Sequence, residues 1–325
     1  MRKFLFLFYM LTGLAATAQV DSARTSSSLM NELDNKTGKS NEKVPAKVFL
    51  SQRLINANTT EMLQKGFLEF KVVHNFGDMG GTFGGKETFY GLDGATDIKI
   101  GFTYGVSKNF NIAVARYKGF DGLHKVTRLF ELALKYRFMQ QMENDRSRPL
   151  SIAMYVNGVS SGAHHTQDTS KEHSFSKASD RQSQLIQLLI ARKFGKILSF
   201  QLNPTYVHTN YVLKGDVKSL FAMGAAIRVP IYKKFVFIAD WFHTFRSEEN
   251  KRSLEARGIK LYDAVGVGLE LVTPGHIFHI NFTNPHNILE NRFLARTTTA
   301  WGRGEYRWGF TVARNFVIVR DKKKK

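Results

Sequence analysis

The sequence predicts an all-β protein, a closed antiparallel transmembrane β-barrel of about 12 strands. Three observations indicate this fold: apolar and polar residues alternate with period two, about a dozen segments have strand length, and short and long connections alternate. Alternation alone would also fit a soluble sheet with its apolar face inward. The lengths of the connections therefore decide between the two.

The alternation is clearest in GATDIKIGFTYGVSKNFNIAVARYKG, residues 94–119. Large apolar residues share one face of each strand, while charge and glycine share the other, an unusual pair for the exposed face of a soluble sheet. A barrel interior can hold both. The residues predicted to face lipid are Ile98, Ile100, Phe102, Tyr104, Phe130, Leu132 and Leu134. The charges predicted to face the lumen are Glu69, Lys71, Asp97, Lys99, Glu131, Lys135 and Arg137.

Segments of about ten residues have the length that a tilted strand needs to cross a bilayer. The candidates are Gly66–Phe76, Ala95–Val106, Asn109–Lys118, Val126–Phe138, Leu150–Val159, Arg181–Arg192, Ile197–Asn210, Leu220–Val229, Phe235–Phe245, Leu261–Val272, His276–Thr283 and Tyr306–Val319. Their number is even, as in most single-chain bacterial barrels.

The connections between these segments alternate in length along the chain. Short turns at 107–108, 194–196, 230–234 and 273–275 alternate with long loops at 75–94, 160–180, 247–258 and 285–305. Outer-membrane barrels place tight turns on the periplasmic side and long loops outside. Only the turn at 139–149 is longer than this rule expects.

The N-terminus resembles a secretory signal peptide at 1–18: a basic start, a short apolar run and an A-x-A site, with cleavage between Ala18 and Gln19. Residues 19–47 are expected to form a flexible periplasmic leader. The barrel is expected to span 48–319, with a short helical turn between Thr59 and Gly66, and 320–325 form a basic tail. The chain has no cysteine, and past the N-terminus it has no apolar run long enough for a transmembrane helix.

Three blocks carry a resemblance to a known family: RLINANTTEMLQKGFLEFKVVHNFG, FYGLDGATDIKIGFTYGVSKNFNIAVAR and FLARTTTAWGRGEYRWGFTVARNFVI. In order and spacing they resemble an uncharacterised family of outer-membrane β-barrels, a domain of unknown function found mainly in Bacteroidota. The resemblance covers roughly residues 48 to 319 and implies a barrel in the outer membrane of a Gram-negative bacterium. It implies no activity and no functional residues. The Lys322–Lys325 end departs from the terminal aromatic of many such barrels.

Three motifs could carry chemistry, and each has a simpler interpretation. Gly158–Gly162 matches the G-x-S-x-G pattern with Ser160 as nucleophile, but no helix follows to form the elbow. His164, His165 and His173 lack cysteine or carboxylate partners at ligand spacing. The glycines at 77–85 lack the helix that a phosphate-binding loop requires. We therefore expect no enzyme activity, no metal site and no cofactor.

The net charge of +20 raises the question of partners. A nucleic acid partner is disfavoured by the signal peptide and the strand pattern. Basic loop residues could instead grip the phosphates of outer-membrane lipid and lipopolysaccharide: Lys251, Arg252, Arg257, Arg292 and Arg303. If lumenal charges contact water, the barrel is a narrow channel or carrier for small polar or anionic solutes. If they pair, it is a non-conducting envelope scaffold or a partner of another envelope protein. A rim hydrolase is the third alternative.

Overall fold

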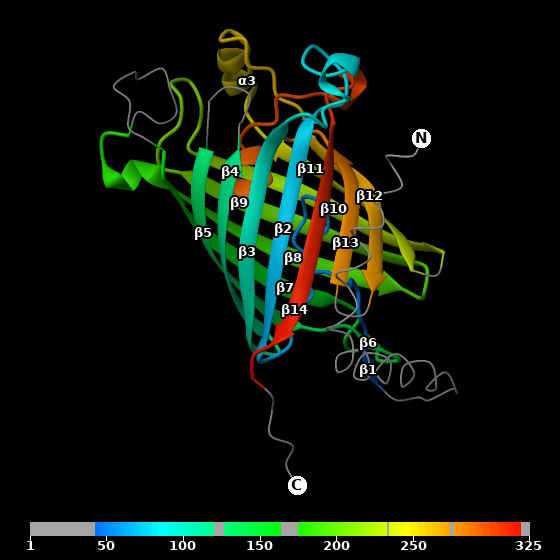
Figure 1. Ribbon diagram of the computed structural model, residues 1–325. Helices are drawn as coiled ribbons and strands as arrows, with labels where there is room; N and C mark the ends of the chain where they lie inside the picture. Colours follow the sequence, from blue (N-terminus) through cyan, green and yellow to red (C-terminus); the bar gives the residue numbers. More distant parts are fainter. Residues whose placement is uncertain (1–42, 120–126, 164–174, 233, 274–275, 320–325) are drawn as a thin grey trace.

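The computed structural model describes residues 43–119, 127–163, 175–232, 234–273 and 276–319. Twelve antiparallel strands close into one barrel, each paired with its neighbour in the chain and the last with the first (Figure 1). The strands are β2 (Phe67–Asp78), β3 (Ala95–Ser107), β4 (Phe110–Gly119), β5 (Thr127–Met139), β7 (Ser151–Ser161), β8 (Gln182–Phe194), β9 (Leu198–Thr209), β10 (Ser219–Tyr232), β11 (Phe235–Phe245), β12 (Ala264–Thr273), β13 (His276–Thr283) and β14 (Arg307–Val317). The predicted fold class and strand number are confirmed.

The barrel closes between β14 and β2. Phe310 lies opposite His74, and Val317 lies opposite Phe67. Closure gives every strand two partners, so no edge is left with unpaired backbone groups.

The two ends of the barrel differ, as the connection lengths predict. One end carries short turns, and the other carries the long loops with the helix α3 (Glu248–Glu255) and the 3₁₀ turns η1 (Lys86–Thr88), η2 (Ala178–Arg181) and η3 (Trp301–Arg303). The exception at 139–149 has a structural reason. It contains β6 (Met142–Glu143), which pairs with β1 (Val44–Pro45) where the chain approaches the turn end.

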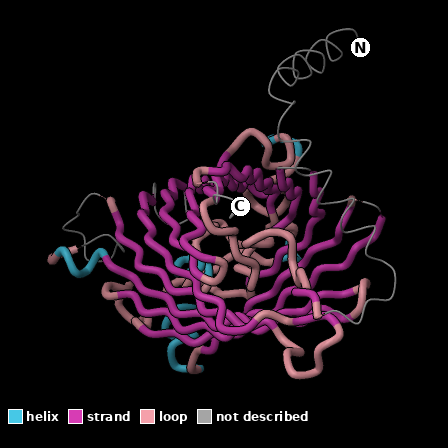
Figure 2. Tube along the Cα trace, turned by 90° about the horizontal axis from the view of Figure 1, so that it is seen from below, coloured by secondary structure: helices cyan, strands magenta, loops and turns pink. Residues whose placement is uncertain are grey.

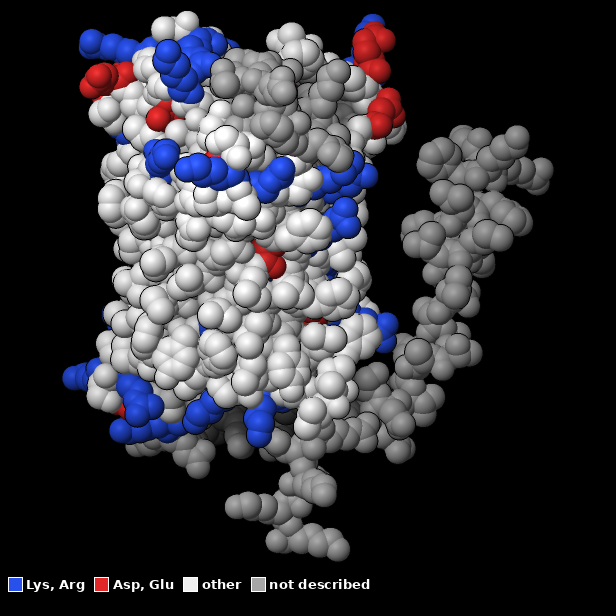
Figure 3. Space-filling view, turned by 90° about the vertical axis from the view of Figure 1, so that its left-hand side faces the viewer, with Lys and Arg blue, Asp and Glu red and all other residues white. Residues whose placement is uncertain are grey.

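Apolar side chains cover the outside of the wall. Ile100, Phe130 and Leu132 are each about half exposed, at 47%, 50% and 55%. The wall seen in Figure 3 has a broad band with few charges, and lysine and arginine gather above and below it. A band of this kind is the surface that a barrel presents to the hydrocarbon of a bilayer.

Two local expectations are wrong. Residues 59–66 form no helical turn, because Thr59 and Thr60 are drawn into an extended segment inside the barrel. β12 begins at Ala264 rather than at Leu261. Both errors lie where the chain leaves the regular alternation of the wall.

Three predicted features fall outside the described residues: the signal peptide with its cleavage site between Ala18 and Gln19, most of the leader, and the basic tail at 320–325. Among the helices that the structure describes, none has the length and hydropathy needed to cross a membrane.

Candidate functional site

The barrel interior is occupied by two segments of the chain itself. From the turn end, residues 48–60 enter as the segment named here the N-terminal plug, and from the loop end residues 284–300 enter as the loop plug. Figure 2 shows loop segments and a short helix inside the ring of strands. The interior of these twelve strands is therefore filled by chain rather than open.

The N-terminal plug is a small hairpin. Arg53 and Asn58 form an antiparallel bridge, and the amide of Leu54 donates to the carbonyl of Ala57 at 2.9 Å across the tip. The Thr59 hydroxyl closes the base by donating to the carbonyl of Ser51 at 2.6 Å. The segment has polar residues at most positions and no period-two pattern, so it cannot serve as a wall strand with one apolar face.

One carboxylate of the wall holds the tip of this hairpin. Asp240 on β11 accepts hydrogen bonds at Oδ2 from the backbone amides of Ile55, Asn56 and Ala57, at 3.2, 2.7 and 3.0 Å. Its Oδ1 accepts from the Asn56 side chain at 2.9 Å. Hydrogen bonds to a charged acceptor contribute more than neutral ones, about 1.5–3 kcal/mol each. Asp240 is therefore the main anchor of the N-terminal plug.

Amides and a hydroxyl on β9 hold the base of the hairpin. Gln201 donates to the carbonyl of Asn58 at 2.6 Å and accepts from the amide of Thr60 at 3.1 Å, and Asn203 donates to the same carbonyl at 3.1 Å. Ser199 donates to the carbonyl of Val48 at 2.5 Å. These bonds satisfy backbone groups that would otherwise be buried without partners.

The neighbouring wall is shaped to receive the hairpin. Gly266 on β12 lies against it, and a Cβ atom there would lie 2.8 Å from side-chain atoms of both Ile55 and Asn56. Gly105 on β3 performs the same role where the chain leaves the barrel, since a Cβ atom would lie 2.0 Å from the carbonyl oxygen of Gln64. Glycine on the inner face thus makes room for the plug.

The loop plug crosses the interior from the opposite end. It contains the single turn α4 (Glu290–Phe293), and the Phe293 ring packs edge-on against Phe242 of β11. The amide of Ile288 donates to Asp97 of β3 at 2.8 Å, and Asn291 donates to Ser183 of β8 at 3.1 Å. The segment is thus fixed to strands on different sides of the barrel.

The two plugs meet at a buried ion pair between Arg53 and Glu290. Arg53 also donates to the carbonyl of Ile288 at 2.6 Å, and Asn58 donates to Glu290 at 3.0 Å. Side-chain exposure is 3% for Arg53 and 0% for Glu290, so neither charge has water as an alternative partner. Breaking such a pair by removing one member is costly, which couples the positions of the two plugs.

The wall formed by β2–β5 contacts the N-terminal plug less closely. Asn111 donates to Gln52 at 3.0 Å and Lys135 donates to the carbonyl of Thr59 at 3.3 Å. Glu131 instead accepts from the hydroxyls of Tyr117 and Tyr155 at 2.7 and 2.6 Å and from Asn157 at 2.7 Å, and Lys99 lies 3.4 Å away. This carboxylate is fully satisfied by the wall, and it leaves little capacity for the plug.

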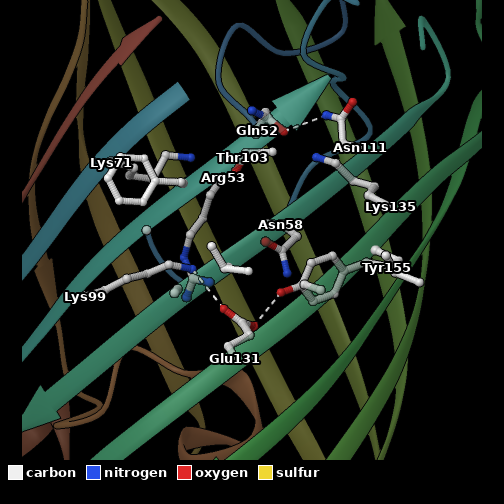
Figure 4. Close-up of a pocket in the computed structure, with 17 residues that line it drawn as sticks. Gln52, Arg53, Asn58, Lys71, Lys99, Thr103, Asn111, Glu131, Lys135 and Tyr155 are labelled. Atoms are coloured by element: carbon white, nitrogen blue, oxygen red, sulfur yellow. Dashed lines mark hydrogen bonds and ion pairs between the residues drawn. The ribbon is translucent and has the colours of Figure 1, made fainter. Parts of the chain in front are cut away.

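Between this wall and the plug lies a cavity of about 50 Å³. Figure 4 shows Lys71, Lys99 and Lys135 pointing from the wall toward Arg53, with Glu131 and Tyr155 below. The small residues Gly101, Ala113, Ala115 and Ala133 leave this space. A volume of this size has room for a few water molecules. Four cationic side chains and one carboxylate line it. Three of the cations pair with a carboxylate: Arg53 with Glu290, Lys71 with Glu69 and Lys99 with Glu131.

All the predicted lumenal charges have their side chains on the inner face of the wall: Glu69, Lys71, Asp97, Lys99, Glu131, Lys135 and Arg137. The predicted lipid-facing residues point outward from the same wall: Ile98, Ile100, Phe102, Tyr104, Phe130, Leu132 and Leu134. Contact of the second set with lipid stays a prediction.

Sequence reasoning missed the residues that hold the plugs. Asp240 lies on the inward parity of FVFIADWF, with Val236 and Ile238, and could have been found from that strand. Arg53 and Glu290 lie outside the wall strands, so the alternation of apolar and polar residues does not predict which way their side chains point. No signal in their local sequence identifies them as partners.

The motifs considered for catalysis or metal binding do not assemble into sites among the described residues. Ser160 lies within β7 on the outer face and accepts a hydrogen bond from Gln182 at 3.1 Å, without a strand-to-helix elbow. A 3₁₀ turn of three residues, not an α-helix, follows the glycines at 77–85. His164, His165 and His173 lie outside the described residues, and the described part of the chain holds no cluster of metal-ligating side chains.

Three of the basic loop residues considered for lipid phosphates contact other residues of the protein. Lys251 pairs with Glu248 at 2.7 Å, the Arg257 guanidinium donates to the carbonyl of Lys214, and Arg303 lies over the ring of Tyr262. Each of these three therefore has a neighbour of its own within the protein. Arg252 and Arg292 also belong to this set, the former on α3 and the latter on α4.

A family model described as "Membrane bound beta barrel domain (DUF5777)" matches residues 49–316. No curated protein matches the chain. Among solved structures, the COG4313 outer membrane channel from Pseudomonas putida F1 is 11% identical and covers 81% of this chain and 100% of its own, with a TM-score of 0.45. The KdgM porin is 8% identical over 77% of this chain and 98% of its own, with a TM-score of 0.43. The NanC porin is 8% identical over 78% and 100%, with a TM-score of 0.42. At these scores the likeness carries no argument about function.

Proposed function

Because this chain belongs to the family of membrane-bound β-barrel domains, DUF5777, we propose that it is an outer-membrane barrel working as a gated narrow channel or carrier for small polar, preferentially anionic, solutes. The N-terminal plug is the gate in this proposal. The structure then represents the closed state, with the long loops outside the cell and the short turns in the periplasm.

The observation that carries the proposal is the set of hydrogen bonds that anchor the plug backbone to the wall. Asp240, Gln201 and Asn203 hold the hairpin backbone by hydrogen bonds. Beside these bonds, Leu54 and Ile55 of the hairpin share a buried hydrophobic cluster with Ile238 and other wall residues. Water can replace each of these hydrogen bonds when the hairpin withdraws, while the apolar surface that withdrawal exposes favours the closed state. The buried Thr60 hydroxyl and the side-chain nitrogen Nε2 of Gln52 have no protein partner among the described residues. Both groups could bind water, which also fits a contact that becomes hydrated when the hairpin withdraws.

Anion preference follows from the side chains that a withdrawn hairpin would expose. Lys71, Lys99 and Lys135 line the cavity, where Glu131 is the single carboxylate among the lining residues. Glu69, which is not a lining residue, pairs with Lys71 at 2.8 Å, which leaves an excess of cations. Cations on the wall of a narrow pore raise the local concentration of anions.

The second candidate is a non-conducting envelope barrel. The buried Arg53–Glu290 pair favours it, because it ties together two segments that enter from opposite ends. In that case the plugs are permanent, and the loops carry the function through a partner protein.

Single-channel conductance with a reversible lock on the gate separates the two candidates. The chain has no cysteine, so a designed pair has no competing thiol. The Asn56 side chain lies 3.0 Å from the Thr283 hydroxyl, which makes Asn56→Cys/Thr283→Cys a suitable pair to tie the hairpin to β13. The single variant Asn56→Cys is the matched control.

We expect discrete current steps from the parent and from the reduced double variant in a planar bilayer, and silence from the oxidised double variant. In a salt gradient, the reversal potential should lie closer to the equilibrium potential of the anion than to that of the cation. A locked barrel that conducts like its parent would rule out the hairpin as the gate. Folded protein that is silent in every form would favour the scaffold.

A further inference from the structure

A basic cluster lies on the outside of the wall, near the loop end. Arg116 and Lys118 on β4 and Arg128 on β5 are all exposed. They lie on the outward parity of their strands, with Val114 and Phe130. Within the part of the chain that the structure describes, no acidic side chain forms an ion pair with any of the three.

The register brings two of these charges face to face. Lys118 and Arg128 are direct cross-strand partners, and Arg116 is the partner of Phe130 one step lower. Like charges in opposite positions of an antiparallel pair destabilise the sheet unless a counter-charge lies between them. The arrangement therefore indicates an anion that both side chains share.

The surroundings of the cluster indicate what carries that anion. Directly below it the wall is apolar, with Val114, Phe130 and Leu132 at 50%, 50% and 55% exposure. Lys118 is one residue from the end of β4, and Arg116 is three residues from it, on the order of 10 Å along the strand. In a bilayer, the three basic side chains would thus lie at the depth of the lipid headgroups, and the apolar residues below them at the depth of the acyl chains.

The same level of the wall offers further polar contacts. Arg116 pairs with Phe130 across β4 and β5, and Phe130 pairs in turn with Ser160 of β7. Ser160 pairs with Gln182 of β8, and a hydrogen bond of 3.1 Å joins their side chains. Figure 3 shows lysine and arginine arranged in a row across the upper part of this wall. Hydroxyl and amide groups beside cations suit a phosphorylated sugar headgroup.

We infer that Arg116, Lys118 and Arg128 form a binding site for the phosphorylated glycolipid of the outer leaflet, the lipid A part of lipopolysaccharide. The site binds a lipid phosphate between Lys118 and Arg128 while the acyl chains lie along Phe130 and Leu132. The inference rests on the proposed outer-membrane orientation but not on conduction, since it concerns only the outside of the wall.

The turn end of the barrel supplies a matched control. Arg192 lies over Phe194 at 5.0 Å and Arg314 over Phe316 at 5.2 Å, as Arg116 lies over Phe130 at 5.2 Å. These two arginines are exposed and outward-facing, but they lie on β8 and β14, which are not neighbours in the barrel. Each is therefore a single charge without a cluster.

The test is native mass spectrometry of the folded full-length protein in detergent, titrated with bisphosphorylated lipid A, dephosphorylated lipid A, phosphatidylglycerol or inorganic phosphate. We expect bisphosphorylated lipid A to bind at least tenfold more tightly than the dephosphorylated form. Arg116→Gln/Lys118→Gln/Arg128→Gln should lose this preference, and Arg192→Gln/Arg314→Gln should keep it. The charge-conserving Arg116→Lys/Lys118→Arg/Arg128→Lys should retain binding within about threefold, which distinguishes charge from strand packing.

Equal affinity of the triple glutamine variant and the parent would overturn the inference. So would saturation by inorganic phosphate at the same concentration as lipid A, which would identify a free-phosphate site, or equal binding of phosphatidylglycerol, which would identify general lipid adsorption. If the triple variant fails to fold, Arg128→Gln alone decides: it should weaken binding about threefold or more, and an unchanged affinity would contradict the site.

Discussion

The two walls that face the N-terminal plug hold it in different ways. On the β9–β12 side, Asp240 and Gln201 bond directly to the plug backbone, and Gly266 lets the hairpin approach closely. On the β2–β5 side, Glu131 is satisfied by wall residues, and a cavity separates much of the wall from the hairpin. The hairpin thus makes most of its hydrogen bonds to the β9–β12 side. On the β2–β5 side, Asn111 donates to Gln52 at 3.0 Å and Lys135 donates to the carbonyl of Thr59 at 3.3 Å.

This difference assigns separate roles to the two walls. The β9–β12 side determines whether the plug stays in place, and the β2–β5 side determines which solute passes once it has left. Substitutions on one side should therefore change mainly the property assigned to that side. A reporter for the plug position is available in Thr60. The residue is 1% exposed and its hydroxyl has no partner among the described residues, so Thr60→Cys removes no hydrogen bond seen in the structure.

The largest effect should come from Arg53, which joins the plugs to each other. Arg53→Met leaves Glu290 buried without its cation, and the loss of one member of a buried pair costs about 3–5 kcal/mol. Maleimide should label Thr60→Cys at least 100-fold faster in this variant. Arg53→Met/Glu290→Met removes both charges and should return the rate to near the parent value. Slow labelling in both variants would show that the ion pair does not hold the plug.

A smaller effect is expected from Asp240, which joins the plug to the β9–β12 side. Asp240→Asn replaces a charged acceptor of four hydrogen bonds by a neutral group, and we expect roughly tenfold faster labelling of Thr60→Cys. The control is Glu270→Gln on β12, which bonds to Arg228 and His279 but not to the plug. It should alter the unfolding of the barrel in urea and not the labelling. An equal labelling increase in both variants would contradict the anchoring role of Asp240.

On the β2–β5 side the expected effect is on selectivity. Lys135 lines the cavity and donates to the carbonyl of Thr59 at 3.3 Å. Lys135→Gln removes one cation from the pore, and the ratio of anion to cation permeability should fall about twofold. The reversal potential in a salt gradient measures it. Lys118→Gln, on the outside of the wall, is the charge-matched control and should leave the reversal potential unchanged. A shift of equal size in both variants would indicate a surface-charge effect rather than a lumenal one.

The sequence predicts the wall well because the wall obeys one simple rule. Alternation and connection length are local properties, and they give twelve strands, the two ends and the inward placement of Lys71 and Glu131. The plugs obey no such rule. Arg53 and Glu290 are 237 positions apart, and their contact depends on how two irregular segments turn inside a closed barrel. The helical turn expected near Thr59 is wrong for the same reason, since capping signals are local and the tertiary hydrogen bonds to Gln201 outweigh them.

The smallest effect should come from the contact where the chain approaches the turn end. Lys43 lies 3.4 Å from Asp145, and hydrogen bonds from Ser147, together with Lys43, lower the pKa of Asp145 below its ordinary value of 3.8. A lowered pKa means that any stabilisation is present when the carboxylate is charged and is lost only as the pH falls through the folded pKa. Because Asp145 lies outside the membrane-spanning strands and the Lys43 side chain is 64% exposed, water and salt screen the pair. Asp145→Asn should therefore change the labelling of Thr60→Cys by less than about twofold at neutral pH. If Thr60→Cys were labelled faster in Asp145→Asn than in Asp240→Asn, the contact between Lys43 and Asp145, and not the β9–β12 side, would keep the plug in place. The separate roles assigned to the two walls would then be wrong.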